Sequence, residues 1–77
     1  MQRIKIDKIP LHVQAASLMR DAITGGAYEP GERLPSETTL AAQLGISRPT
    51  LREALLNLER ESLIIRRHGV GTFVANA

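Results

Sequence analysis

The chain has 77 residues, which is enough for one small domain with a thin hydrophobic core. Hydrophobic residues make up 43% of the sequence, too many for a disordered chain, and with one Phe, one Tyr and no Trp the core must be mainly aliphatic. The absence of Cys excludes disulfides and Cys-based zinc sites, and the net charge of +2 is only mildly basic.

The first expected element is a helix that follows an extended N-terminal arm, residues 1–9. From Pro10 onward apolar residues recur at helical spacing, and the face they form consists of Leu11, Ala15, Leu18, Met19, Ala22 and Ile23. Gly25 and Gly26 end the helix, and one of them suits the left-handed position found after many helices. A Pro-Gly turn and a very short extended piece near Leu34 come next.

Two helices separated by a tight turn are expected in the middle of the chain. Ser36 is a good N-cap for a helix that stops at Gly45, and Ser47 is the N-cap of the next helix, which runs to about residue 61. The intervening turn places Ile46 between the helices, so the segment has the pattern of a helix-turn-helix. The second of these helices has an apolar face made of Leu51, Ala54, Leu55 and Leu58, and it leaves Leu56 exposed.

The apolar period then changes from helical to alternating, which indicates two strands. Residues 63–67 and 72–74 flank the sequence "HGVG", so an antiparallel hairpin with a glycine-containing tip is expected. The predicted fold is therefore mainly α with a small β-hairpin. It is a winged helix-turn-helix domain over residues 10–75, with three helices, a two-stranded wing and a minimal third strand near Leu34.

Two arginines carry the main functional indication. At 100° per residue, Arg48 and Arg52 lie about 40° apart on one flank of their helix, beside the leucine face, so both are expected to remain exposed. Guanidinium groups bind guanine in the major groove through two parallel hydrogen bonds, and they also bind phosphate. The alternative is an ordinary solvated surface on which Arg52 pairs with Glu53 or Glu59.

The first turn of this helix and the hairpin tip supply further groups for DNA binding. Ser47 and the unpaired N–H groups of the helix start suit a phosphate, and Thr50 suits a phosphate or a thymine methyl group. Pro49 costs no hydrogen bond in this turn. At the tip, Gly69 lets the backbone approach the minor groove, with Arg67 and His68 beside it; otherwise these positive charges only protect an edge strand.

Other functions find little support in the sequence. No Gly-rich phosphate loop, paired catalytic carboxylates or nucleophilic triad is present, so we expect no enzyme activity. The two histidines, His12 and His68, match no metal-ligand spacing, and neither a metal nor a cofactor is expected in this domain. No apolar run approaches 18 residues, so we expect no membrane contact and a cytoplasmic, nucleoid-associated protein.

Three motifs together resemble a known family. The sequences "PGERLPSE", "LGISRPTLREAL" and "GVGTFV", in this order, are similar to the N-terminal winged helix-turn-helix domain of the GntR family of bacterial transcription regulators. The resemblance implies that Arg48, Thr50 and Arg52 contact DNA from the recognition helix. It also implies that Ser36 and Glu37 lie against phosphate, and it assigns the minor-groove wing to His68, Gly69 and Gly71.

The sequence departs from the family pattern at three positions. Thr38 stands where an arginine is common, so a phosphate contact is expected to be lost there. Thr39 stands where a glutamate often completes a capping box with Ser36. Ser62 stands where glycine is usual, and a left-handed conformation at this position would cost about 1 kcal/mol.

The family resemblance also implies properties of a longer protein. Residues 76–77 are expected to begin a linker to an absent C-terminal domain that binds a small-molecule effector. The full-length protein is expected to bind a palindromic operator as a homodimer and to act as a repressor. The alternative function is a winged helix that serves as a protein-interaction module, an interpretation to which the exposed Leu56 contributes.

Overall fold

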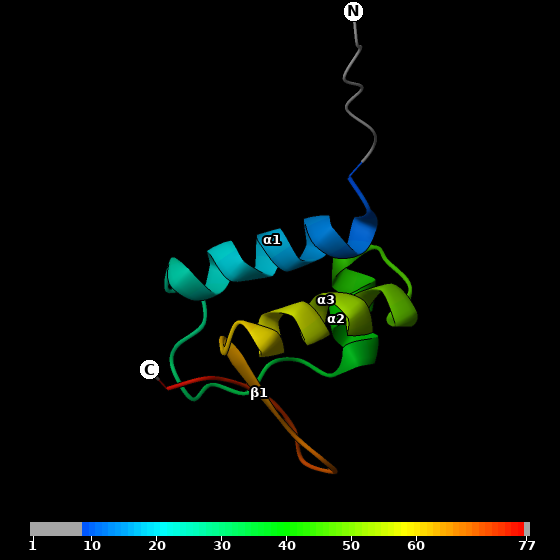
Figure 1. Cartoon of the computed structure of the whole chain (residues 1–77). Coiled ribbons are helices and arrows are strands. Elements are labelled where there is room, and N and C mark those ends of the chain that lie inside the picture. The colour runs from blue at the N-terminus through cyan, green and yellow to red at the C-terminus, as the bar shows by residue number, and fades with distance from the viewer. Residues whose placement is uncertain (1–8, 77) are drawn as a thin grey trace, which may run out of the picture.

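The computed structural model describes residues 9–76 and contains three helices and one hairpin within that range (Figure 1). The elements in chain order are α1 (Leu11–Thr24), α2 (Glu37–Leu44), α3 (Arg48–Arg60), β1 (Ile64–Arg67) and β2 (Gly71–Val74). The predicted helices and hairpin are confirmed, with small differences at their ends. The predicted arm lies, except for Ile9, outside the described residues, as does Ala77 of the predicted linker.

All three helices end in the same way. The N–H of the second or third residue beyond each helix donates to a carbonyl five residues earlier: Ala27 to Ala22, Ile46 to Ala41 and Leu63 to Leu58, at 2.8, 3.1 and 3.0 Å. This pattern is a Schellman motif, and it requires a left-handed residue just before that N–H. The left-handed residues are Gly26, Gly45 and Ser62.

Ser62 is the strained member of this set. Its φ is 62°, and it is the only non-glycine residue with positive φ among those described. The left-handed conformation places the Cβ atom of an L-residue too close to the carbonyl oxygen that follows. The cost expected from the sequence is therefore present in the folded protein.

We expect Ser62→Gly to raise the free energy of unfolding by about 1 kcal/mol, because the Cβ clash disappears at an exposed position where no packing is lost. For a domain of this size that gain raises the thermal midpoint by about 4–8 °C. Ser17→Gly is the matched control, since Ser17 is exposed inside α1 and the same change there lowers stability by about 0.5 kcal/mol. Thermal unfolding followed by circular dichroism measures both, and a fall in midpoint for Ser62→Gly would contradict the explanation.

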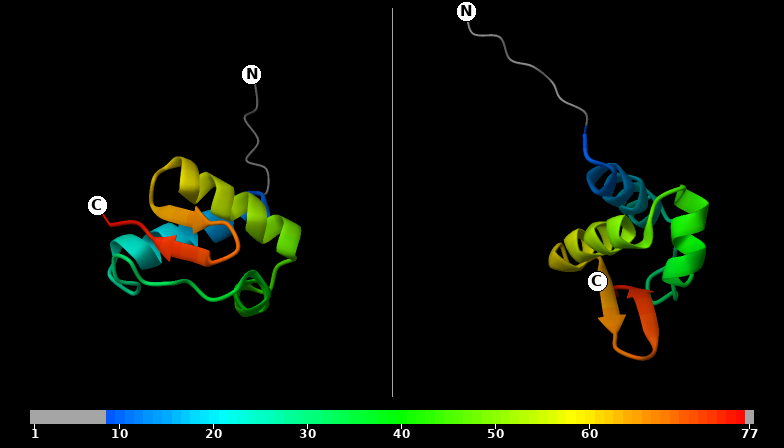
Figure 2. Two further views of the ribbon diagram at one scale, coloured as in Figure 1. Left: turned by 90° about the horizontal axis from the view of Figure 1, so that it is seen from below. Right: turned by 90° about the vertical axis from the view of Figure 1, so that its right-hand side faces the viewer.

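Helix α3 is the centre of the core. Its leucine face is almost completely buried, α1 and α2 both pack against it, and β1 lies beside it (Figure 2). The side chains buried with it come from every other element and from the loop before α2. The buried set is Ala15, Ala16, Met19, Leu34, Leu40, Ala41, Leu51, Ala54, Leu55, Leu58, Ile64 and Val74. Ile46, in the turn between α2 and α3, packs against this cluster as the sequence predicted.

The apolar face predicted for α1 was partly wrong. Leu11 and Leu18 are 56% and 61% exposed, whereas Ala15, Ala16 and Met19 are buried. The exposed leucines lie roughly 100° around the helix from the buried group. Hydrophobic periodicity identified an apolar half of the helix, but α3 covers only the part of it where two alanines allow close approach.

The hairpin is antiparallel, with Ile64 opposite Val74 and Arg67 opposite Gly71. The segment before α2 adds a minimal third strand, because Leu34 N–H donates to the Thr72 carbonyl and Arg33 forms an isolated bridge with Phe73. The third strand expected near Leu34 is thus confirmed. This third strand bonds β2 to the segment that leads into α2. It thereby fixes the direction in which the hairpin projects from the helices (Figure 1).

One exposed ion pair joins the first helix to the end of the third. Arg20 donates two hydrogen bonds to the Glu61 carboxylate, at 2.7 and 2.6 Å. These bonds lower the pKa of Glu61 and raise that of Arg20.

None of the helices within residues 9–76 combines the length and apolarity that a membrane crossing requires.

Candidate nucleic-acid interface

The start of α3, the start of α2 and the hairpin meet around one carboxylate. Glu37, the first residue of α2, pairs through one oxygen with Arg48 at 3.6 Å and with Arg52 at 3.1 Å. Its other oxygen lies 3.0 Å from the guanidinium of Arg66, on β1. The first turns of the helix-turn-helix and the wing therefore share one face of the molecule.

The two arginines of α3 are exposed, as predicted. Their side chains are 53% and 51% accessible, while the leucines of the same helix pack into the core. The interpretation in which Arg52 pairs with Glu53 or Glu59 is wrong about the partner, since Arg52 pairs with Glu37. Fifteen residues separate Arg52 and Glu37 in the sequence, so helical spacing could not reveal this pair.

The first turn of α3 is held by local hydrogen bonds. Ser47 Oγ accepts the N–H of Thr50 at 3.2 Å and donates to Thr50 Oγ1 at 2.8 Å, so both predicted residues take part in the cap. Pro49 is exposed between them. The remaining N–H groups of this turn point along the helix axis toward solvent, where the helix dipole favours an anion.

The first turn of α2 is capped by the same pair of hydrogen bonds. Ser36 Oγ accepts the N–H of Thr39 at 3.2 Å, and it donates to Thr39 Oγ1 at 3.1 Å. A glutamate at position 39 would instead reach back to the N–H of Ser36. Thr39 is too short to do this, so only half of a capping box is formed.

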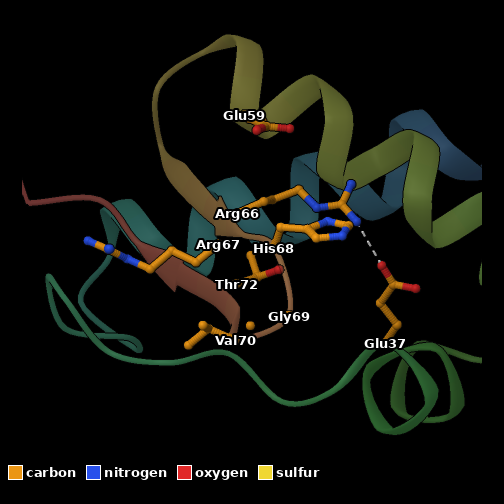
Figure 3. A pocket seen from close by; sticks show the side chains of 9 residues that line it. Glu37, Glu59, Arg66, Arg67, His68, Gly69, Val70 and Thr72 are labelled. Atoms are coloured by element: carbon orange, nitrogen blue, oxygen red, sulfur yellow. Dashed lines mark hydrogen bonds and ion pairs between the residues drawn. The ribbon is translucent and has the colours of Figure 1, made fainter.

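An open hollow of about 520 Å³ lies between the hairpin, the start of α2 and the end of α3 (Figure 3). Arg66 and His68 point into it from the hairpin, and Arg66 reaches Glu37 on the opposite side (Figure 3). The residues that line the hollow are Glu37, Glu59, Arg66, Arg67, His68, Gly69, Val70, Gly71 and Thr72. The predicted wing residues therefore border the same hollow as the start of α2.

The structure distinguishes two neighbouring arginines of the hairpin. The side chain of Arg67, a predicted wing contact, points away from Glu37, and its guanidinium carbon lies 5.9 Å from the centre of the Phe73 ring (Figure 3). Arg66 faces the helices instead, because successive side chains of a strand point to opposite faces and Ile64 is the one buried in the core. Arg66 was missed as a site residue because the sequence did not show which of Ile64 and Ile65 faces inward.

The hairpin tip has little side-chain bulk at Gly69. This residue has a φ of 74°, and a Cβ atom built there would meet no other atom within 4 Å. The backbone at the tip is therefore open to a partner molecule. Gly71 is different, because a Cβ atom there would lie 2.7 Å from Nε of Arg33.

A comparison with protein families matches residues 11–74 to the model described as "Bacterial regulatory proteins, gntR family". The chain belongs to this family. The predicted resemblance is thus confirmed, and membership of a family of regulatory proteins agrees with the prediction that the chain is not an enzyme.

Curated relatives of this gntR-family chain include regulators from several bacteria. It is 44% identical over 66 residues to the Histidine utilization repressor of Pseudomonas aeruginosa, covering 86% of this chain and 26% of that protein. It is also 44% identical over 71 residues to the HTH-type transcriptional repressor NagR of Bacillus subtilis, covering 92% and 29%. The chain thus spans less than a third of the length of these relatives.

Solved structures confirm the winged helix-turn-helix fold. The structure of AraR(DBD) in complex with operator ORX1 has a TM-score of 0.84 and 30% sequence identity, over 97% of this chain and 93% of that one. A GntR family transcriptional regulator from Listeria monocytogenes has a TM-score of 0.86 and 27% identity, over 95% and 64%. Both likenesses cover nearly all of this gntR-family chain.

Proposed function

We propose that this chain is the sequence-specific, DNA-binding part of a bacterial transcriptional repressor. One observation carries the proposal: exposed arginines from α3 and from the hairpin gather on one face, around the start of α2. The operator complex of the similar AraR(DBD) supports it. The names of the two curated relatives support the repressor role.

In this proposal α3 enters the major groove with its first turn foremost. The groove is about 12 Å wide, which admits one helix. Arg48 and Arg52 then reach base edges or phosphates, and Thr50 contacts the backbone or a thymine methyl group. Ser47 and Pro49 lie against the phosphates that flank the groove, where the N–H groups of the helix start favour negative charge.

The hairpin supplies the second contact. Its tip lies over the minor groove, which is narrow enough to require the small Gly69 at the point of closest approach. His68 and Arg66 point from the hairpin toward the helices, and in the complex they lie along the phosphates between the two grooves. Ser36 lies against phosphate at the start of α2. Arg67 contacts DNA only if the face of the hairpin that points away from the helices turns toward the DNA phosphates.

The proposal extends to the longer protein. The relatives are more than three times as long as the aligned part, which supports a further, C-terminal domain for a small-molecule effector. That domain would hold two DNA-binding heads as a homodimer on a palindromic operator. The spacing of the half-sites would then follow from the two-fold symmetry of the dimer.

Salt dependence tests the proposal. After selection of a preferred duplex from a random pool, we expect affinity for it to fall about a hundredfold between 50 and 200 mM salt, as about four phosphate contacts require. The selected sequence should bind more tightly than the unselected pool at every salt concentration. Fluorescence anisotropy of the labelled duplex measures both quantities.

A protein-interaction module is the second candidate, favoured by the exposed apolar side chains Leu11, Leu18 and Leu56. If this were the only function, the chain would bind no duplex even at low salt, or would bind selected and unselected duplexes equally. Either result would contradict the DNA-binding proposal.

A further inference from the structure

Glu37 is an unusual residue to find at a surface meant for DNA. Its carboxylate carries the same charge as a phosphate, yet it stands among the three arginines Arg48, Arg52 and Arg66. It is also the least exposed member of the group, with 23% of its side chain accessible against 34–53% for the arginines. The guanidinium groups thus enclose the carboxylate and leave their outer sides open.

Stability alone does not explain this arrangement. Ion pairs between exposed side chains contribute little to the free energy of folding, because water screens them and long side chains lose conformational freedom. The α2 and α3 helices are already fixed by buried leucines and by the turn between them. What Glu37 controls more directly is where the guanidinium groups point and how much positive charge this face presents.

The pairing also joins the wing to the recognition helix. Arg66 lies opposite Thr72 in the hairpin, one residue pair from the Arg67–Gly71 pair at the tip. On the β2 side the hairpin is attached through the bridge at Arg33 and the hydrogen bond from Leu34 N–H to the Thr72 carbonyl, and at its base it continues directly from α3. The contact between Glu37 and Arg66, at 3.0 Å, adds a link on the β1 side of the wing, one residue pair from its tip, and joins the wing to the start of α2.

We propose that Glu37 is a positioning residue that sets sequence specificity rather than affinity. It orients the guanidinium groups of Arg48, Arg52 and Arg66 for the contacts that they make with one particular duplex. It also neutralises one positive charge, which would otherwise attract the phosphates of DNA of any sequence. Attraction to phosphate depends on charge alone, whereas two-point recognition of a base depends on the orientation of the guanidinium. This inference rests on the proposed DNA-binding function.

The test compares Glu37→Gln with Glu59→Gln. Glutamine has the shape of glutamate without its charge, so Glu37→Gln releases the arginines with little change in volume. Glu59 lines the same hollow. Its carboxylate forms no ion pair with any residue in the described range 9–76. Glu59→Gln therefore removes the same charge without releasing an arginine. Circular dichroism melting establishes that both variants fold.

We expect Glu37→Gln to bind the unselected duplex pool about three- to tenfold more tightly than the wild type, with a steeper dependence on salt. Its affinity for the selected duplex should stay the same or fall, so the ratio of the two affinities drops about tenfold. Glu59→Gln should raise both affinities slightly and leave their ratio unchanged. Glu37→Asp keeps the charge but is one methylene shorter, so it should leave binding to the pool weak and lower the affinity for the selected duplex. It provides the test if Glu37→Gln does not fold, and unchanged affinity for both duplexes would then contradict the positioning role.

Three results would overturn the inference. Equal affinity ratios for Glu37→Gln and Glu59→Gln would show that only net charge matters. A changed base preference at a single position, with unchanged binding to the pool, would show that Glu37 itself reads a cytosine. Absence of selective binding by the wild type would instead refute the proposed function and this inference with it.

Discussion

Leu55→Ala is expected to remove about 2–5 kcal/mol from the free energy of unfolding, because Leu55 is 1% exposed at the centre of the only core that the described residues form. The change deletes buried methyl groups and leaves a cavity that the surrounding leucines fill only in part. A domain of this length has a total stability of roughly 4–12 kcal/mol. The variant is therefore expected to lose a large share of its stability, and with it any function.

Leu56→Ala is the matched control for this prediction. Leu56 is the next residue of the same helix and is 41% exposed, so the intrinsic helix preference changes equally while little burial is lost. We expect it to stay within about 0.5 kcal/mol of the wild type. Urea unfolding followed by circular dichroism measures both variants, and a difference between them of less than 1 kcal/mol would show that the core is not centred on α3.

Arg48→Ala is expected to weaken binding to the selected duplex by about 1–3 kcal/mol, or roughly 5- to 150-fold, and to relax specificity at one base pair. The expectation follows from the position of Arg48 at the first residue of α3, exposed and outside the core. Titration of the selected duplex, and of duplexes changed at single base pairs, measures both effects.

Arg60→Ala provides the comparison that separates position from charge. Arg60 is an exposed residue in the last turn of the same helix, at the end away from the proposed DNA contact. Removing its charge should lower affinity for all duplexes slightly and equally. If Arg48→Ala and Arg60→Ala have the same effect on the selected and unselected duplexes, α3 does not read DNA through its first turn.

The helices and strands of this fold could be predicted because each is indicated by residues close together in the sequence. A serine at the start and a glycine at the end mark α2, and the interactions they make span only a few residues. The change from helical to alternating periodicity after residue 62 predicted the hairpin for the same reason. The strain at Ser62 was indicated by the family pattern, which usually has glycine there, and the Schellman motif in the structure supplies the reason for the left-handed conformation.

The candidate site was predicted only in part. The exposure of Arg48 and Arg52 followed from their angle to the leucine face, which is a property of one helix. The surroundings of these arginines did not follow, because their partner Glu37 comes from another helix and Arg66 comes from the hairpin. Selecting Arg67 instead of Arg66 has the same origin, since it depends on which face of a strand meets the helices.

By itself the sequence determined where the helices begin and end, where the chain turns, and which helix carries exposed arginines, because hydrogen bonds and periodicities within a few residues decide these features. Only the tertiary structure decided which leucines of α1 are covered, which wing arginine faces the helices, and that one carboxylate joins three arginines. Those features depend on contacts between residues far apart in the sequence, such as Glu37 and Arg66, which are 29 positions apart. Such contacts exist only after the core has fixed the distance and rotation between the elements.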